Sequence, residues 1–184
     1  MSDILILTET WLEVDEDISK YSLAEYTADL NSQGRGRGIA SYYKSNFNHV
    51  MNLNCEGFSI SKIGSEKMDI IGIYRSQGAN DMDLIEKLKM LYDKEKTTII
   101  GGDLNICVRA HPENYITKNL KELGFQQVVT ESTHIDGGVL DHIYLSQYEN
   151  ITSNWIVDYF PKYYSDHDAI GLIMLEDMRE QIDG

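Results

Sequence analysis

The stretch TTIIGGDLN, residues 97–105, carries most of the information about the fold. It begins as an apolar, β-branched run, continues through two glycines and reaches Asp103 and Asn105. Such a run predicts a buried strand, and the glycines let the backbone turn sharply at its end. Residues two apart on an extended chain project to one side, so Asp103 and Asn105 can face a common pocket. They could orient a water and hold a phosphoryl oxygen, although a plain turn fits the pattern equally well.

Short β-rich segments recur along the rest of the chain, and several alternate polar with apolar residues. They span residues 3–9, 38–45, 58–64, 68–75, 97–102, 138–146, 151–159 and 169–175. Only residues 80–94 and 115–123 have the apolar spacing of helices, and the second segment ends at Gly124, a residue suited to helix C-termini. Many strands with few helices predict an α/β sandwich of two sheets with the helices outside.

The composition predicts one globular domain, residues 1–184, because 42% apolar residues can bury a core without disulfides or a structural metal. Cys55 and Cys107 form no CxxC pair, which fits packed thiols in an intracellular compartment, the cytoplasm or the nucleus. No stretch approaches the roughly 20 apolar residues needed to span a bilayer. We therefore expect a soluble protein without membrane contact.

The net charge of −14 disfavours tight, salt-resistant DNA binding, because Lys and Arg supply most of the affinity for a phosphate backbone. The same charge is a weaker argument against catalysis on DNA, because a bound divalent cation makes the local charge at a carboxylate cluster positive.

Three further segments carry acids at strand ends or inside strands. In LTETWL, Glu9 could hold a hard cation, but this segment alone favours a solvated loop residue. In GGVLDHIYLS, Asp141 lies within an apolar strand and requires a partner there, whereas His142 on the opposite face is interpreted as packed or exposed. In YYSDHDAIGLIML, His167 would be the natural partner of Asp141, with a simple Ser-Asp turn at Asp166 as the alternative.

Several acids that converge at one edge of a sandwich repel one another unless a cation lies among them. The sequence therefore predicts a metal site. Its candidate residues are Glu9, Asp103, Asn105, Asp141, Asp166 and His167.

In order along the chain, LTETWL, GRGRGIASYY, IIGIYRSQ, IIGGDLN, GGVLDHIYLS and YSDHDAI resemble successive motifs of the endonuclease/exonuclease/phosphatase family. The resemblance implies a deoxyribonuclease-I-like fold, a four-layer α/β/β/α sandwich of two mainly antiparallel sheets. The wording of LTETWL and THIDGGVLDHIYLS is most similar to endonuclease domains of retrotransposons and other mobile elements.

The resemblance also implies roles for the candidate residues. Glu9 matches the metal-binding glutamate, and Asp166 is placed for the metal or a water on it. Asp103 would align or deprotonate the attacking water, and Asn105 would steady the phosphate.

Further implied roles concern the phosphate. His167 would stabilise the charge that develops there, with Asp141 holding its ring. Tyr74 would reach a phosphate oxygen, and Arg75 is a weaker candidate for the same contact. The arginines of GRGRG, Arg35 and Arg37, could touch a nucleic-acid backbone, although such residues are more often a solvated turn.

The beginning of this sequence departs from the pattern of the family. The family opens with a strand bearing an Asn near the metal, whereas here Met1 stands just before the strand that ends at Glu9. The resemblance thus implies a sandwich lacking its first strand, N-terminally truncated, with exposed ladder groups on the neighbouring strands. Self-association or a partner chain could fill that open edge.

The function predicted from these observations is Mg²⁺- or Mn²⁺-assisted hydrolysis of a phosphodiester, in DNA, by a mobile-element type of endonuclease. Two alternatives stay open: a phosphatase of small phosphorylated lipids or inositols, and a weak or inactive domain kept as a binding module.

Overall fold

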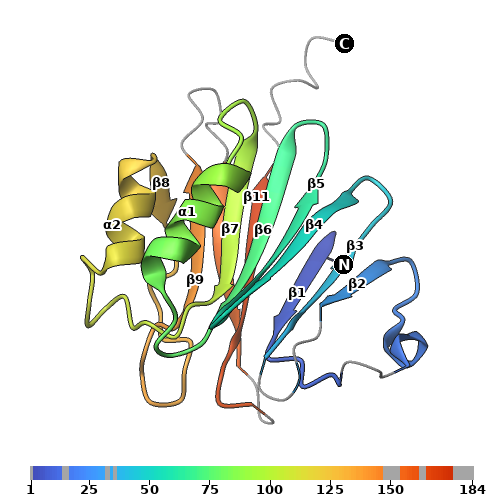
Figure 1. The fold of residues 1–184 in the computed structure, drawn as a ribbon, viewed down its shortest axis with the longest axis horizontal. Coiled ribbons are helices and arrows are strands. Elements are labelled where there is room, and N and C mark those ends of the chain that lie inside the picture. The colour runs from blue at the N-terminus through green and yellow to red at the C-terminus, as the bar shows by residue number, and fades with distance from the viewer. Residues whose placement is uncertain are drawn as a thin grey trace.

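The computed structural model describes residues 2–13, 17–31, 34, 37–146, 154–161 and 165–175. Within these ranges the centre is a six-stranded sheet (Figure 1). Its strands, in spatial order, are β4 (Asn48–Cys55), β5 (Phe58–Gly64), β6 (Met68–Arg75), β7 (Thr97–Asp103), β9 (Asp141–Ser146) and β8 (Phe125–Gln127). The β6–β7 pair is parallel and the other four pairs are antiparallel.

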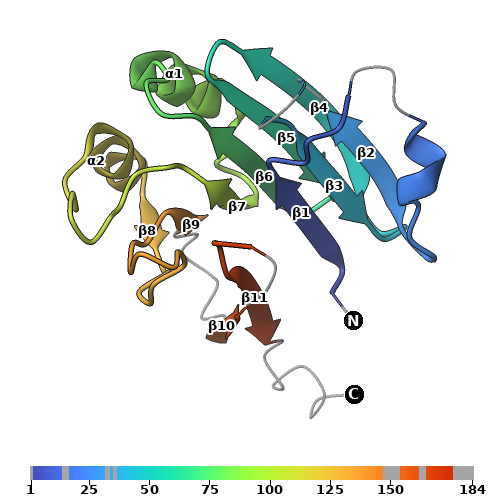
Figure 2. The ribbon, with the colours of Figure 1, turned by 90° about the horizontal axis from the view of Figure 1, so that it is seen from below.

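Two smaller sheets form a second layer on one face of the large sheet (Figure 2). One has the order β1 (Ile4–Thr8), β3 (Ile39–Tyr43) and β2 (Thr27–Asn31), and η1 (Ile18–Tyr21) is a short 3₁₀ helix between β1 and β2. The other pairs β10 (Asn154–Phe160) with β11 (Ala169–Leu175). The second layer is therefore divided in the part of the chain that the structure describes.

The two pieces pack onto different parts of the large sheet. β1 lies against β6 and β7, and a Cβ built on Gly72 would come within 2.9 Å of Ile6. β10 and β11 pack through Val157, Tyr159, Ile170 and Leu172 against a separate apolar cluster. The members of that cluster are Val128, Val129, Val139 and Ile143.

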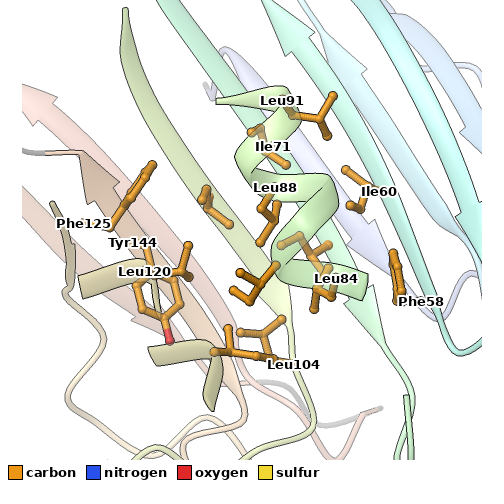
Figure 3. Packing of buried hydrophobic residues seen from close by; sticks show 14 residues of the cluster. Phe58, Ile60, Ile71, Leu84, Leu88, Leu91, Leu104, Leu120, Phe125 and Tyr144 are labelled. Atoms are coloured by element: carbon orange, nitrogen blue, oxygen red, sulfur yellow. The ribbon is translucent and has the colours of Figure 1, made fainter. Parts of the chain in front are cut away.

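Helices α1 (Asp81–Leu91) and α2 (Tyr115–Glu122) cover the opposite face of the large sheet (Figure 2). Their amphipathic sequences bury Leu84, Leu88 and Leu120 against strand residues that include Ile60 and Ile71 (Figure 3). Asparagine caps begin both helices, with the side chain of Asn80 accepting hydrogen bonds from two backbone N–H groups of α1. This core fixes the large sheet that carries the candidate site.

The α/β sandwich predicted from the sequence is confirmed, including both helices. Strands β2, β4 and β8 were not expected, because their sequences are short or rich in Asn, Asp and Gln, which disfavour strands. The described α-helices cover only the large sheet, and the second layer is in two pieces rather than one within the described residues. No helix within the described ranges is long and apolar enough to cross a bilayer.

The close pairing of β7 with β6 gives a test of the fold. Gly102 has a φ of +143°, and a Cβ there would lie 1.9 Å from the carbonyl oxygen of Ile73. We expect Gly102→Ala to lower the free energy of unfolding by more than about 3 kcal/mol, since overpacking alone costs about 1–3 kcal/mol. Gly78→Ala, also at positive φ but with open space around it, should cost only about 1–2 kcal/mol. Urea unfolding followed by circular dichroism measures both, and equal losses would contradict the close approach.

Candidate active site

The register of the central strands aligns three polar residues at one end of the large sheet. Tyr74 on β6 pairs with Asp103 on β7, and Asp103 pairs with Asp141 on β9. The close approach at Gly102 brings Asp103 into a position where it is only 2% exposed. The same end of the sheet therefore receives one phenol and two carboxylates from three strands.

Asp103 is held by the residue two positions later. Its Oδ1 accepts the backbone N–H of Asn105 at 2.8 Å, and its Oδ2 accepts the side-chain amide of Asn105 at 3.0 Å. Burial, and then the negative charge of Asp141, raise the pKa of the Asp103 carboxyl to about 7. A carboxyl with that pKa can take up a proton near neutral pH, as a general base must.

Asn105 adopts a φ of +52°, a conformation that Asn tolerates better than most residues. Its side-chain nitrogen donates to the carbonyl oxygen of Arg75 at 2.9 Å as well as to Asp103. Because the amide has two N–H donors, both are used within the protein. Contact with a phosphate oxygen would require one of these bonds to be exchanged.

Asp141 and His167 form the pair expected from the sequence, with Oδ2 of Asp141 2.8 Å from Nδ1 of His167. The hydrogen bond to Asp141 raises the pKa of His167 to about 9; burial opposes this shift, and the charges of Asp141 and Asp103 add to it. His167 is therefore a cation at neutral pH, and its Nδ1–H donates to Asp141. Its Nε2 is the ring nitrogen that can meet a substrate.

Thr133 and His134 were not singled out from the sequence, yet they hold the His167 loop. Thr133 is fully buried, and its Oγ1 accepts the backbone N–H groups of Leu140 and Asp141 at 3.0 and 3.1 Å. His134 and His167 form an isolated antiparallel bridge, and their rings meet edge to face with centroids 4.9 Å apart. The feature of the sequence that could have identified them is their position in THIDGG, residues 133–138, shortly before Asp141.

Glu9 lies just beyond β1 with a φ of +50°. Its Oε1 accepts the hydroxyl of Tyr74 at 2.9 Å. Burial, and then this bond, raise the pKa of Tyr74, so the phenol stays protonated and donates. The Tyr74 hydroxyl, predicted to reach a phosphate oxygen, is directed at Glu9 in this structure and positions that carboxylate.

These groups meet at a pocket of about 440 Å³. Its lining comprises Glu9, Gln77, Asn105, His134, Asp136, Gly138, Leu140, Asp166 and His167. Four predicted residues, Glu9, Asn105, Asp166 and His167, thus lie in its wall. Asp103 and Asp141 are hydrogen-bonded to two of these wall residues. The structure thus brings these six side chains together at one end of the sandwich, and their roles stay predictions.

The donors fit a hard divalent cation. Glu9, Asp166 and Asn105 line one pocket, and carboxylate and amide oxygens such as theirs are the ligands of Mg²⁺. Burial raises the pKa of Asp103 most, and the negative charges of Asp141 and Glu9 raise it further; a cation would offset this repulsion between carboxylates. Two sets of three residues also have ligand atoms within 4.8 Å of one another and could hold a metal ion: Asp103 with Asp141 and His167, and His134 with Asp166 and His167.

The arginines differ from expectation. Arg75, a candidate phosphate contact, is only 7% exposed and donates to Asp81 at 2.7 Å and to the carbonyl of Leu104 at 3.1 Å. That prediction is wrong, because the guanidinium is committed to linking α1 to the loop after β7. Arg37 is exposed, and Arg35 lies outside the described residues.

His142, which was interpreted as packed or exposed, is packed in the structure. Its ring nitrogens lie against the hydroxyl of Tyr144 and the carbonyl of Ile106.

Comparison with known proteins gives a consistent result. The model of the endonuclease/exonuclease/phosphatase family matches residues 1–167. A search of curated protein sequences found no match.

Solved structures similar to this chain include three nucleases. An AP endonuclease from Archaeoglobus fulgidus aligns with a TM-score of 0.72 and 16% identity, over 94% of this chain and 88% of that one. A 3′-5′ exonuclease from Neisseria meningitidis aligns with a TM-score of 0.73 and 16% identity, over 94% and 89%. The endonuclease domain of TRAS1, a telomere-specific non-LTR retrotransposon, aligns with a TM-score of 0.65 and 13% identity, over 93% and 84%. At these identities the similarities establish the fold.

The ion pair of the site gives a pH prediction. Because the pKa of His167 lies at about 9, above its ordinary 6.5, the pair's stabilisation is fully present below about pH 6.5 and is lost as pH rises through about 9. Asp141→Asn removes the largest cause of the shift, and we expect the pKa of His167 to fall well below 9, because burial is then opposed only by the charges of Asp103 and Asp166. Ring-proton NMR titration in metal-free buffer measures the change. A pKa that stayed near 9 in the variant would contradict the assigned partner.

Proposed function

Because the chain belongs to the endonuclease/exonuclease/phosphatase family, we propose that it hydrolyses phosphodiester bonds in DNA with the help of a divalent cation, Mg²⁺ or Mn²⁺. The observation that carries the proposal is the convergence of the Asp103–Asn105 and Asp141–His167 pairs, with Glu9, on one pocket. This arrangement combines a carboxyl of raised pKa, an oriented imidazolium and oxygen donors for a metal.

The residues divide the work of an in-line displacement by water. Asp103, oriented by Asn105, accepts a proton from the attacking water, which its pKa of about 7 permits near neutral pH. His167, held as a cation by Asp141, donates from Nε2 to a phosphoryl oxygen and stabilises the negative charge that develops there.

Glu9 and Asp166 would hold the metal, with Asn105 as a further oxygen donor in the same wall. When bound, the cation would supply positive charge that stabilises the transition state of phosphoryl transfer. Tyr74 keeps Glu9 in place through its hydroxyl. Asn105 would turn one amide N–H to the phosphate when substrate displaces its present partner.

Two exposed apolar side chains close in sequence to pocket residues favour a nucleic acid over a small, polar phosphoester. Trp11 is 59% exposed two residues from Glu9, and Ile135 is 81% exposed between the pocket residues His134 and Asp136. Exposed aromatic and aliphatic side chains of this kind stack on bases or wedge between base steps. They have no matching partner in an inositol or phosphate headgroup.

A mobile-element type of endonuclease is the finer form of the proposal. It is supported by the wording of LTETWL and THIDGGVLDHIYLS and by the similarity in fold to the TRAS1 endonuclease domain. The net charge of −14 implies weak binding to DNA with a shallow dependence on salt, because few cationic side chains release counterions from the phosphate backbone.

A second feature, the edges of the divided layer, supports association with another strand. Within the described residues, β1 pairs only with β3 and β11 only with β10, and β11 is the strand of its pair nearer to β1 (Figure 2). Apolar side chains are exposed on both strands, Leu7 at 50% and Ile173 at 46%. Unpaired strand edges with exposed apolar residues recruit further strands, so we propose self-association or a partner chain at this edge.

A plasmid-nicking assay in Mg²⁺ at low salt tests the activity. We expect the wild-type chain to convert supercoiled into nicked plasmid, and chelation to abolish the reaction. His167→Ala should lower the rate about 10²- to 10³-fold, because it removes a donor to the developing charge. His111→Ala is the matched control, since His111 is exposed and does not line the pocket.

The outcomes separate the alternatives. Phosphate release from inositol phosphates without plasmid nicking would make the chain a phosphatase. Binding of DNA without cleavage of either substrate would make it a binding module. Equal rates for the His167 and His111 variants would remove His167 from the mechanism.

Light scattering over a range of protein concentrations tests the strand edge. We expect the wild-type chain to exceed the monomer mass as concentration rises. Leu7→Lys combined with Ile173→Lys should restore a monomer, because charged side chains at an edge oppose strand pairing. Met90→Lys, at an exposed apolar position of α1, is the control and should associate like the wild type. A wild-type monomer at every concentration would contradict self-association.

A further inference from the structure

Three side chains in the wall of the pocket form a second donor group, different in chemistry from the oxygen donors around Glu9. His134, Asp166 and His167 each offer one ligand atom, and these atoms lie within 4.8 Å of one another. Two imidazoles and a carboxylate suit Zn²⁺, whereas Mg²⁺ prefers oxygen ligands alone. We propose that these three residues bind a zinc ion at a site that shares Asp166 with the hard-cation site.

The backbone already holds the two loops in register for such a site. Ile135 N–H donates to the carbonyl of Asp166 at 2.9 Å, and Asp168 N–H donates to the carbonyl of Thr133 at 2.8 Å. The antiparallel bridge between His134 and His167 lies between these bonds. Rotation of the exposed Asp166 side chain, 67% of which is accessible, is then the main movement that coordination requires.

The ring of His167 has the orientation of a metal ligand. A histidine that binds a metal through one nitrogen usually donates its other N–H to a carboxylate, which fixes the ring. Here Nδ1 of His167 donates to Asp141 at 2.8 Å, so Nε2 is the atom offered to the pocket. Zinc would displace the proton of Nε2 to solvent, as metal binding to protonated ligands does.

The hydrogen bonding of His134 would change when zinc binds. Its Nε2 lies 3.6 Å from Oδ2 of Asp166, another of the three ligands. Its Nδ1 accepts the backbone N–H of Asp136 at 3.2 Å and lies 3.6 Å from Oδ2 of Asp136. Zinc on Nε2 would place the ring proton on Nδ1, and the bond from the backbone N–H would then be exchanged for one donated by Nδ1 to the Asp136 carboxylate.

Zinc at this site would inhibit the proposed reaction. The ion would take Nε2 of His167, the atom that donates to the phosphate, and Asp166, a proposed ligand of the catalytic cation. This consequence rests on the proposed function, whereas zinc binding itself does not.

Competition with a chromophoric zinc chelator tests the binding. We expect one tight site per chain that millimolar Mg²⁺ does not displace. His134→Gln should weaken zinc binding about tenfold or more, and Asp166→Asn should weaken it in the same direction. His111→Gln is the matched control and should bind like the wild type, with circular dichroism used to compare the folds. Equal zinc affinity in wild type and His134→Gln would overturn the site.

The nicking assay then tests the consequence. Zinc added to the Mg²⁺ reaction should inhibit the wild type and His111→Gln at concentrations that match their zinc affinity. His134→Gln should require about tenfold more zinc for the same fractional loss of its own zinc-free rate. Inhibition at unchanged zinc concentration in His134→Gln would overturn the inhibitory role. Absence of any nicking would refute the proposed function while leaving the zinc titration to decide the site.

Discussion

The pairing of β7 between β6 and β9 is the constraint on which the rest of the structure depends. It brings Gly102 so close to Ile73 that only a residue without a Cβ can stand there. The next residue, Asp103, is then delivered opposite Tyr74 on one side and Asp141 on the other. A shift of this register by one residue would turn the Asp103 side chain to the other face of the sheet. The candidate base would then be separated from the histidine and its partner.

Asp141 connects the electrostatics of the site, because it acts on two neighbours in ways that suit the proposed catalysis. Its charge adds to burial in raising the pKa of Asp103 to about 7, and its hydrogen bond raises the pKa of His167 to about 9. At neutral pH the pocket therefore holds a carboxyl near its midpoint close to a stable imidazolium. Environments that give neighbouring groups different protonation states are how one site performs both proton transfer and charge stabilisation.

The divided second layer makes the geometry of the pocket depend on two separate packing contacts. Glu9 follows β1, which packs onto β6 through Ile6, whereas His167 precedes β11, which packs with β10 on the cluster around Ile143. The two residues face one pocket although the strands that bear them belong to different small sheets. A strand added between β1 and β11 would tie these two walls together. Pairing of another strand at this edge would therefore fix the positions of Glu9 and His167 relative to each other.

The sequence by itself determined which segments bury one face and which polar residues stand at their ends. The helical spacing of apolar residues in 80–94 and the apolar run at 97–102 report burial locally, so α1, β7 and Asp103 could be predicted without a structure. The same reasoning required a partner for Asp141, and the structure supplies His167. In contrast, β4, with the sequence NHVMNLNC, becomes a strand only because it pairs with β5.

Apart from the Asp141–His167 pair, only the tertiary structure decided the partners of these polar side chains. Tyr74 donates to Glu9, 65 residues away in the chain, and Arg75 is buried against Asp81 and Leu104 instead of facing a phosphate. His134 reaches His167 through a bridge between two loops. Local periodicity carries no information on such pairs, because a hydrogen bond between distant segments depends on sheet register and loop packing.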